Sequence, residues 1–401
     1  MTRVLYVNHT STISGAERSL LELLEAIAPE VDSFLACPDG DLANAARDLG
    51  VLTFKIRPIN LSFRLEPIQT SGGLLGLAGA AFDIARAVRA ARADVVHANS
   101  VRAGMAAILA RAEGAPQPIV HVRDVLPASL SGCLTAAMVR KWSFVALANS
   151  QFTASAIRGS SSADVRVVYN AVDPKQFNGD TATGERVRAE LDLAASTPTL
   201  GVIAQLTPWK AQDDAIRTLA LVRRQVPDAH LLLAGEVKFK DRSTRFDNVA
   251  YEEGLHRLAT EAGVAGAVAF LGERTDIPQL LQALDILLVP SWEEPFGRVI
   301  LEAMAAGTPV IATAVGGPSE IIVDRETGLL LRPKDPSLWA EAVVELLVNP
   351  ASRKELAGRA RSAVETNFNR KAQVDAITAI YEGVAAGRLD SGGPVFEEGR
   401  K

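Results

Sequence analysis

Cysteine is scarce in this sequence. The 401 residues include two cysteines, Cys37 and Cys133, too few for the disulfide framework of a secreted protein. The first residues also lack the long apolar segment of a signal peptide. We therefore expect a cytoplasmic protein.

A surplus of basic residues and a long apolar run are missing too. Lys and Arg number 42 against 47 Asp and Glu, a net charge of −5, which argues against nucleic acid as a partner. The longest apolar run, Leu74 to Phe82, is far shorter than the roughly 20 residues that cross a membrane. We expect neither a nucleic-acid partner nor a membrane span.

Common metal and cofactor motifs are absent as well. The sequence contains neither His-Glu-x-x-His nor Cys-x-x-Cys, and its Asp-x-Asp pattern, Asp39 to Asp41, has the composition of a turn before a helix. No Gly-x-Gly-x-x-Gly follows the first predicted strand, which argues against a nicotinamide oxidoreductase. We therefore expect no metal and no cofactor.

Short apolar segments alternate with segments of helical periodicity along the chain, a pattern typical of parallel sheets joined by crossover helices. In the first half, strands are predicted at residues 4–7, 33–37, 94–97, 119–122, 144–148 and 165–168. In the second half, they are predicted at residues 200–204, 230–234, 268–271, 286–290, 308–312 and 329–331. The sequence thus predicts an α/β fold with two doubly wound, Rossmann-like sheets.

A polar segment with prolines and glycines, residues 173–198, separates the two halves. It predicts a boundary between one domain over residues 1–172 and another over residues 190–369. A helix at about residues 370–387 is expected to pack back on the first domain, and residues 388–401 to form a disordered tail. Ligands of such sheets bind beyond the carboxyl ends of the strands, so residues that directly follow strands are the functional candidates.

The first candidate is the segment Ser14-Gly15-Ala16-Glu17, which follows the first strand. Ser14 and Glu17 have the spacing of a capping box, which predicts the start of a helix. Gly15 would let the backbone approach an anion there, because the N–H groups and dipole of a helix N-terminus favour negative charge.

The second candidate follows the strand expected at residues 286–290. Pro295 suits the first turn of a helix, and Gly307 suits its C-terminal end. Glu294 would then lie at the helix entrance and Glu302 two turns further on. Such carboxylates either accept hydrogen bonds from ligand hydroxyl groups or remain solvated surface charges, and both interpretations stay open.

Two further candidates follow other strands. Lys210 comes after the strand at residues 200–204, where its ammonium would contact a phosphate as a point charge; the alternative is a surface lysine. His121 stands at the end of the strand at residues 119–122 and is one of five histidines; the alternative is a structural histidine.

Together these segments resemble the family 4 retaining glycosyltransferases of the GT-B fold, more strongly in the second half of the chain. The motifs are Ser14-Gly15-Ala16-Glu17-Arg18, Tyr169-Asn170-Ala171-Val172-Asp173, Trp209-Lys210-Ala211-Gln212, Glu294-x7-Glu302 and Gly316-Gly317-Pro318-Ser319-Glu320. The resemblance implies two Rossmann-like domains facing across a cleft. The second domain would bind a nucleotide-diphosphate sugar, and the first would bind the acceptor.

The resemblance also implies roles for individual residues. Glu302 corresponds to the carboxylate that binds the ribose hydroxyls, and Glu294 to the carboxylate beside the transferred sugar. Lys210 corresponds to a diphosphate-binding lysine, and His121 to a histidine near the reacting carbon; with Glu294 these are the implied catalytic residues. The other implied donor-binding residues are Gly15, Gln205, Arg274, Phe296, Gly297, Arg298 and Val299.

Gln205 departs from the family pattern, in which an arginine helps to neutralise the leaving diphosphate. Glutamine carries no charge, and loss of such a contact costs about 3–4 kcal/mol in the transition state. Either another cation compensates, or turnover is slow, or the chain belongs to a subset without this arginine. The candidates for compensation are Arg123, Lys238, Lys240, Arg274 and Arg298.

The implied activity is transfer of a sugar, with retention at the anomeric carbon, from a UDP- or GDP-sugar to a hydroxyl acceptor. A lipid-linked glycan, a polysaccharide and a small molecule all fit as acceptor. A non-catalytic scaffold that binds nucleotide sugar and a nucleotide-sugar epimerase are the alternatives. Residues 54–65 mix apolar and basic side chains. Three interpretations stay open: an ordinary strand with its connecting loop, a loop that covers the acceptor, and a peripheral contact with the inner face of the cytoplasmic membrane.

Overall fold

The chain divides into two compact units in the computed structural model. Unit 1 comprises Met1–Asn170 together with the helix that begins at Arg370, and unit 2 comprises Ala171–Asn369. The structure describes residues 1–59, 67–126, 129–158, 164–177, 181–238 and 246–387. The tail predicted at residues 388–401 lies outside these residues.

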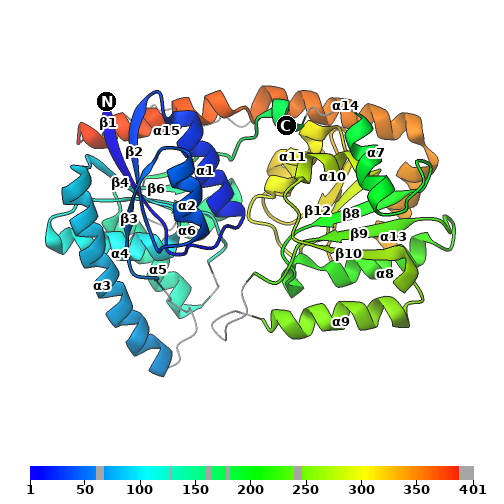
Figure 1. Ribbon diagram of the computed structural model, residues 1–401, viewed down its shortest axis with the longest axis horizontal. Helices are drawn as coiled ribbons and strands as arrows, with labels where there is room; N and C mark the ends of the chain where they lie inside the picture. Colours follow the sequence, from blue (N-terminus) through cyan, green and yellow to red (C-terminus); the bar gives the residue numbers. More distant parts are fainter. Residues whose placement is uncertain (60–66, 127–128, 159–163, 178–180, 239–245, 388–401) are drawn as a thin grey trace. The chain divides into compact units, whose positions relative to one another are not determined.

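Unit 1 is built on a parallel sheet with the strand order β3-β2-β1-β4-β5-β6-β7 (Figure 1). The strands are β1 (Thr2–Val7), β2 (Val31–Cys37), β3 (Leu52–Lys55), β4 (Val95–Ala98), β5 (Ile119–Val122), β6 (Val145–Ala148) and β7 (Val165–Val167). The helices are α1 (Gly15–Ile27), α2 (Asp41–Asp48), α3 (Pro67–Ala91), α4 (Val101–Ala110), α5 (Leu130–Trp142), α6 (Gln151–Ile157) and α15 (Arg370–Ala385).

Alternate strand residues of unit 1 face opposite layers of helices, as the pleat of a strand requires. Val4 and Tyr6 of β1 lie in the core shared with α1, α2 and α15, whereas Leu5 and Val7 lie in the core shared with α3 and α4. The C-terminal helix α15 packs on α1 and β1 (Figure 1). The last helix therefore completes the core of the first sheet.

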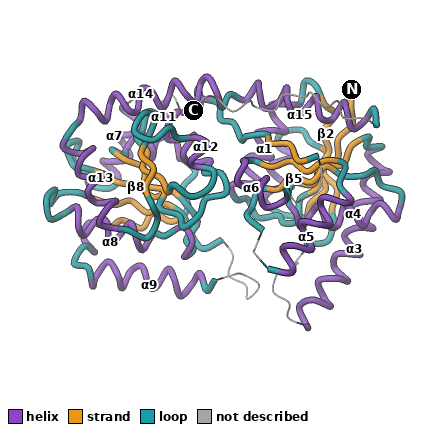
Figure 2. Tube along the Cα trace, turned by 180° about the vertical axis from the view of Figure 1, so that it is seen from behind, coloured by secondary structure: helices purple, strands orange, loops and turns teal. Residues whose placement is uncertain are grey.

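Unit 2 is a second parallel sheet between helices, with the strand order β10-β9-β8-β11-β12-β13 (Figure 2). The strands are β8 (Thr199–Ile203), β9 (His230–Ala234), β10 (Val268–Gly272), β11 (Ile286–Val289), β12 (Val310–Thr313) and β13 (Leu329–Leu331). The helices are α7 (Thr181–Glu190), α8 (Gln212–Val222), α9 (Asn248–Glu261), α10 (Ile277–Ala283), α11 (Arg298–Ala306), α12 (Pro318–Ile321), α13 (Pro336–Val348) and α14 (Pro350–Asn367).

The predicted α/β class with two doubly wound sheets is confirmed. The edge strand β3 was predicted only as part of an ordinary strand and loop, and its four residues are half-buried or exposed, so they show little apolar pattern. The strand predicted at residues 308–312 begins at Val310, because the Thr308 N–H is bonded to the Ala303 carbonyl at the end of α11 and Pro309 has no N–H.

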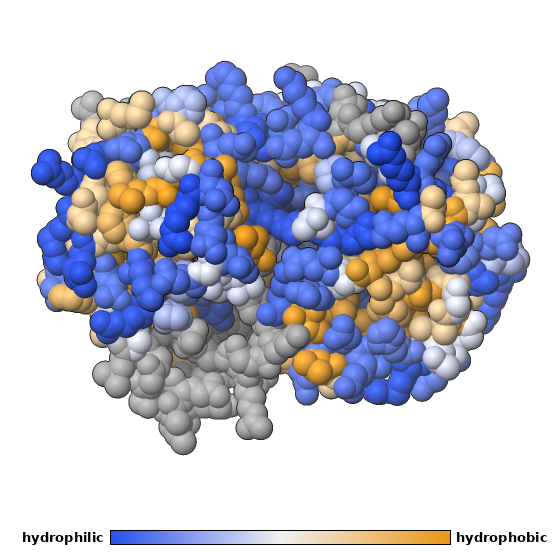
Figure 3. Space-filling model, in the orientation of Figure 1, coloured by the Kyte–Doolittle hydropathy of each residue, from blue (hydrophilic) through white to orange (hydrophobic). Residues whose placement is uncertain are grey.

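On the face that Figure 3 shows, hydrophilic side chains of the described residues predominate, with apolar patches between them. Large apolar residues that remain exposed, such as Leu130 and Val348, lie on different helices. Among the described residues, no helix combines the length and the apolar character needed to cross a membrane.

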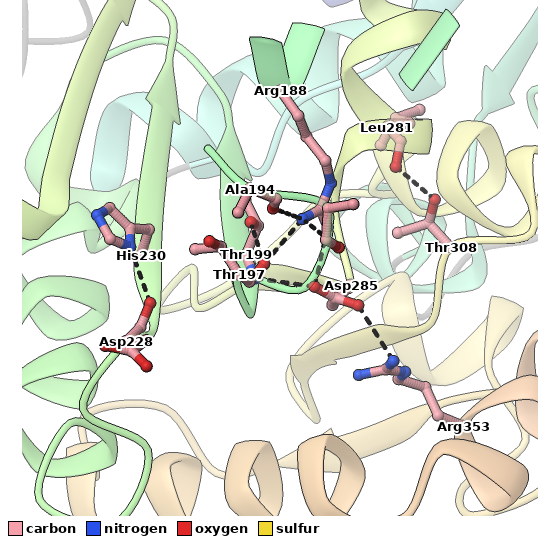
Figure 4. A network of polar contacts seen from close by, with 11 residues as sticks. Arg188, Ala194, Thr197, Thr199, Asp228, His230, Leu281, Asp285, Thr308 and Arg353 are labelled. Atoms are coloured by element: carbon pink, nitrogen blue, oxygen red, sulfur yellow. Dashed lines mark hydrogen bonds and ion pairs between the residues drawn. The ribbon is translucent and has the colours of Figure 1, made fainter. Parts of the chain in front are cut away.

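The segment predicted as the domain boundary belongs to unit 2, which begins at Ala171. Arg188 of α7 contacts Asp285, with 3.0 Å between Nη2 and Oδ2, and donates a second bond to the Thr197 carbonyl (Figure 4). Asp285 also accepts the Thr199 N–H and pairs with Arg353 of α14 at 3.1 Å. The Asp285 carboxylate thus joins α7, β8 and α14 at the start of β11. The residues around Asp285 in the sequence do not predict its pairing with these two arginines.

Replacing Asp285 by asparagine should lower the free energy of unfolding of unit 2 by about 2–3 kcal/mol, because two partly buried guanidinium groups lose their shared anion. Urea unfolding followed by fluorescence measures the change. Asp228→Asn is the matched control, since Asp228 is exposed and only its backbone carbonyl contacts His230. Equal stability of the two variants would contradict this role for Asp285.

The core of unit 1 contains three buried or half-buried histidines. Burial lowers the pKa of His9 to about 4 and that of His97 to about 3, with Arg102 and Arg123 contributing as nearby positive charges. Burial and Arg123 also hold the pKa of His121 well below 6.5. All three side chains are therefore neutral in the folded protein at neutral pH.

Unit 1 should lose stability when the pH falls below 6.5. The unfolded chain then protonates these histidines while the folded chain does not, so each contributes about 1.4 kcal/mol of lost stability per pH unit down to its folded pKa. Urea titrations at pH 7.5, 6.5 and 5.5 measure the slope. His9→Gln should reduce the slope by about one proton, and an unchanged slope in that variant would refute the assignment.

Candidate functional site

Three loops meet at the carboxyl edge of the unit 2 sheet and are fastened to each other by backbone hydrogen bonds. The loop after β11 contacts the loop after β8 through a bond of 2.9 Å from the Trp292 N–H to the Trp209 carbonyl. It contacts the loop after β12 through bonds from the Glu294 N–H to Val315 and from the Gly317 N–H to Glu294. These bonds fix the backbone positions from which the side chains of Glu294 and its neighbours extend.

Lys210 and Glu294 form an ion pair within this group of loops. The Lys210 ammonium lies 2.6 Å from Glu294 Oε2, and the Ser291 hydroxyl donates to the same oxygen at 3.0 Å. The side chains of lysine and glutamate are only 16% and 8% exposed, and the ammonium also lies 4.0 Å from the centre of the Trp209 ring. A charge-assisted contact therefore holds both candidate side chains in place.

Helix α11 begins three residues later than the sequence predicts. Pro295 precedes the helix, and Gly297 is the N-cap with a φ of +94°. A Cβ on Gly297 would come within 2.7 Å of the Ile300 side chain, so both the backbone conformation and the space require glycine. The first helical residues are Arg298 and Val299, whose N–H groups have no acceptor within a helix. Gly307 ends the helix in the left-handed conformation, as predicted.

Glu302 lies on the buried side of α11 and pairs with Arg298 one turn earlier. The distance from Arg298 Nε to Glu302 Oε1 is 2.7 Å, and the two side chains are 14% and 12% exposed. Phe296, which precedes the helix, is buried. The structure therefore gives Glu302 a fixed cationic partner at the helix N-terminus rather than the solvated surface position that the sequence left open.

Two other predicted donor-binding residues have different surroundings. The Gln205 carbonyl accepts a hydrogen bond from the side chain of Gln212, which joins the loop after β8 to α8. Arg274 contacts Glu190 at 2.6 Å and Asp276 at 2.6 Å, and these carboxylates raise its pKa. Its guanidinium thus connects the loop after β10 to α7, a structural use that the resemblance does not imply.

The cations that could replace the positive charge absent at Gln205 lie in different parts of the structure. Arg123 is buried in unit 1, and Lys238 pairs with Glu273 at 2.5 Å. Lys240 lies outside the residues that the structure describes. Arg298 is the candidate that stands at the N-terminus of α11, beside Glu302.

Gly15 is exposed at the first position of α1, directly after the loop that follows β1. The predicted capping box is present: the Ser14 N–H and hydroxyl both donate to Glu17 Oε2, at 3.1 and 2.5 Å. Glu17 also accepts a bond from Asn8. A Cβ on Gly15 would meet no protein atom within 4 Å, so packing within the chain does not require glycine here.

A buried polar network lies beneath this helix start. Arg123 donates from Nε to Asn99 at 2.9 Å and from Nη1 to Ser19 and Asn170. Asn99 in turn donates to Asn8, the partner of Glu17. Arg123 therefore holds together the ends of β1, β4 and β5 and the segment after β7.

His121 is 1% exposed and lies against a second histidine. Its Nδ1 is 3.2 Å from His97 Nε2, and His97 Nδ1 is 2.6 Å from the Tyr381 hydroxyl of α15. His121 Nε2 is buried and has no hydrogen-bond partner among the described residues. In this structure His121 thus has both a structural partner and an unused ring nitrogen.

Sequence reasoning missed Ser291, Asn99, His97 and Tyr381. His97 carries a usable signal, since it occupies a position in its strand analogous to His121 and ends an apolar run. Tyr381 carries none, because the local pattern of its helix shows only an apolar stripe.

Asp39 and Gly40 form a bend directly before α2, and Asp41 is the first residue of that helix. Asp39 pairs with Lys55 at 2.7 Å, and this contact lowers the pKa of the aspartate. Within the described ranges, no group of three or more His, Cys, Asp or Glu side chains is arranged to hold a metal ion.

Curated relatives match about half of the chain. The D-inositol 3-phosphate glycosyltransferase of Stackebrandtia nassauensis is 37% identical over 199 residues, which are 49% of this chain and 44% of the relative. The enzyme of the same name from Salinispora arenicola is 35% identical over 231 residues, 55% of this chain and 50% of the relative. The chain spans about half the length of the curated relatives it matches.

Solved structures share the fold over nearly the whole chain. The Anabaena protein HepE, crystallised with UDP and glucose, matches with a TM-score of 0.83 and 23% identity over 95% of this chain and 100% of its own. Sucrose-phosphate synthase from Thermosynechococcus elongatus matches with a TM-score of 0.79 and 22% identity over 96% of this chain and 100% of its own.

Two family models match in succession. Residues 13–176 match the family described as Glycosyltransferase Family 4, and residues 184–363 match the family described as Glycosyl transferases group 1. The first match lies almost wholly in unit 1 and the second lies within unit 2. With both of its units matched in this order, the chain belongs to the family 4 glycosyltransferases.

Proposed function

We propose that the protein is a retaining glycosyltransferase that moves a sugar from a nucleotide diphosphate, with UDP favoured, to a hydroxyl acceptor. The observation that carries the proposal is the pairing of Lys210 with Glu294 and of Arg298 with Glu302 at one helix N-terminus. HepE, which shares the fold, was crystallised with UDP-glucose, and this supports UDP as the nucleotide.

The electrostatics of this edge suit a diphosphate. Arg298 is the first residue of α11, and Lys210 pairs with Glu294, which precedes that residue by four positions. The N–H groups and the positive dipole end of such a helix start attract anions. Lys210 is neutralised by Glu294 while no donor is bound. An incoming diphosphate offers it a second anion, so Lys210 can bind phosphate without leaving a buried carboxylate unpaired.

The two carboxylates would bind the other two parts of the donor, the ribose and the transferred sugar. Glu302 has one oxygen on Arg298 and would accept the ribose hydroxyls with the other, in short charge-assisted bonds. Glu294 receives both Lys210 and Ser291 on Oε2, and its second oxygen would accept from the transferred sugar. Both carboxylates are held before the donor arrives, which reduces the entropy lost on binding.

Retention follows from a course in which the acceptor attacks from the face that the diphosphate leaves. The departing phosphate oxygen takes the acceptor proton, so the carboxylates need not act as base or nucleophile. Lys210 and the α11 N–H groups stabilise the negative charge that grows on the leaving phosphate. Trapping a glycosyl adduct on Glu294 would contradict this course.

Unit 1 is proposed to supply the acceptor side and the backbone at Gly15. Relatives named D-inositol 3-phosphate glycosyltransferase act on a phosphorylated cyclitol by their names, which supports a small hydroxyl compound as acceptor. The alternatives, an epimerase and a scaffold without turnover, are separated by measuring sugar transfer from UDP-glucose.

UDP at 100 times its dissociation constant should stabilise the protein by about 2.7 kcal/mol, a rise in melting temperature of about 5–10 °C for a unit of this size. Glu302→Gln should remove most of that rise, because the amide cannot offer an ionised acceptor to the ribose. Scanning fluorimetry with UDP, GDP, ADP and TDP measures both effects and identifies the base.

Glu355→Gln is the control for this measurement, because Glu355 also pairs with an arginine one turn away but lies on the exposed face of α14. This variant should keep the full response to UDP. If Glu302→Gln and Glu355→Gln respond alike, the nucleotide binds elsewhere.

Gly15→Ala should keep or slightly raise the melting temperature, since alanine is the better helix residue and its Cβ meets no protein atom. The same change should raise the KM for the donor at least several-fold if substrate phosphate approaches this backbone. Gly358→Ala, an equally open glycine in α14, is the matched control. Unchanged kinetics in both variants would remove Gly15 from the site.

A further inference from the structure

Four polar side chains form a continuous chain inside unit 1. The Tyr381 hydroxyl of α15 donates to Tyr6 of β1 at 3.0 Å and lies 2.6 Å from His97 Nδ1 of β4. His97 Nε2 lies 3.2 Å from His121 Nδ1 of β5. All four residues are essentially inaccessible to water, with 0–1% exposure. Their hydrogen bonds are therefore made with protein groups, which are one another and, for Tyr6, also Ser33.

The strand pairing explains why these residues meet. Tyr6 and His97 are direct partners in the parallel register of β1 and β4, and His121 lies on the same face of β5, further toward the carboxyl end. Helix α15 covers this face and brings Tyr381 down onto it. The chain thus runs from the C-terminal helix toward the edge where substrates bind in such sheets.

The protons of this chain can be placed one after another. Tyr381 has a single hydroxyl proton and donates it to Tyr6, so its oxygen accepts from His97, which therefore carries its proton on Nδ1. His97 is neutral because burial holds its pKa at about 3, so its Nε2 has no proton and accepts from His121 Nδ1. His121 is neutral for the same reason, which leaves its Nε2 as a bare lone pair.

We propose that Tyr381 and His97 are positioning residues that hold His121 as its Nδ1–H tautomer, so that Nε2 accepts a hydrogen bond from a hydroxyl group of the bound substrate. The proposal rests on the glycosyltransferase function proposed above for the identity of that substrate, but not for the tautomer. It explains why this buried nitrogen has no partner among the described residues. It also gives α15 a part in substrate binding, although no residue of that helix belongs to the donor site.

The direction of the chain depends on Tyr6 as the acceptor at its end. In Tyr6→Phe, the hydroxyl of Tyr381 loses this acceptor and has His97 Nδ1 as its remaining partner in the chain. Donation to Nδ1 moves the proton of His97 to Nε2, and His97 then donates to His121 Nδ1. His121 would therefore carry its proton on Nε2, the opposite of the wild-type arrangement.

The test is nitrogen-15 NMR of the full chain labelled on histidine, without substrate, at neutral pH. Five histidines give five pairs of ring nitrogens, and His121→Gln and His97→Gln assign two of them. In the wild type, we expect His121 protonated on Nδ1 and bare on Nε2. In Tyr6→Phe, we expect both tautomers to reverse, and in Tyr381→Phe we expect a mixture of the two.

Tyr251→Phe is the matched control, because it removes a partly buried tyrosine hydroxyl in unit 2 that contacts Asp213 and no histidine. It should leave the spectra of His97 and His121 unchanged. A wild-type His121 protonated on Nε2 would overturn the proposal. Unchanged tautomers in a folded Tyr6→Phe would overturn it as well, and Tyr381→Phe provides the same comparison if Tyr6→Phe does not fold.

Kinetics with UDP-glucose then link the tautomer to function. When His121 carries its proton on Nε2, it presents an N–H donor to the substrate hydroxyl in place of an acceptor. The value of kcat/KM should therefore fall about tenfold in Tyr6→Phe, while that of Tyr251→Phe stays near the wild-type value. An equal fall in the two variants would refute the positioning role. If no variant, including the wild type, consumes UDP-glucose, the proposed donor is wrong, and the NMR result alone decides the tautomer.

Discussion

Parallel pairing is the constraint on which the described structure depends. Every strand pair in the two sheets is parallel, so all strands of one sheet end at the same edge and the chain must return by a helix each time. The central strands are buried on both sides, so polar groups gather beyond their carboxyl ends. Asn8, Asn99 and Arg123 do so in unit 1, and Lys210 and Glu294 do so in unit 2.

The same constraint explains what the sequence could predict. Fully buried strands are short apolar runs, so β5 and β9 were predicted with the bounds that the structure shows, whereas the half-exposed edge strand β3 has no such run. The start of α11 was misplaced because proline is common in a first turn, whereas here the left-handed Gly297 is the N-cap and the helix starts three residues later. Backbone conformations of this kind depend on neighbouring loops and leave little trace in composition.

The candidate site was predictable in its members and unpredictable in their pairing. Glu294, Glu302 and Lys210 follow strands and belong to motifs, but nothing local says that Lys210 pairs with Glu294 or that Arg274 is used by Glu190 and Asp276. Such contacts arise between loops far apart in the sequence. Tyr381 is the extreme case, because its partners His97 and Tyr6 lie in the first quarter of the chain.

The position of α15 in unit 1 makes unit 2 an insertion within unit 1. During synthesis, the first sheet leaves the ribosome with one of its faces still lacking Ile377, Ile380 and Tyr381, and it waits for about 200 further residues, roughly 10–40 s at ordinary elongation rates. Unit 2, whose segments are contiguous, can fold in that interval. The order of maturation is thus the reverse of the order of translation, and the half-covered first sheet is the stage at which a nascent chain would most need a chaperone.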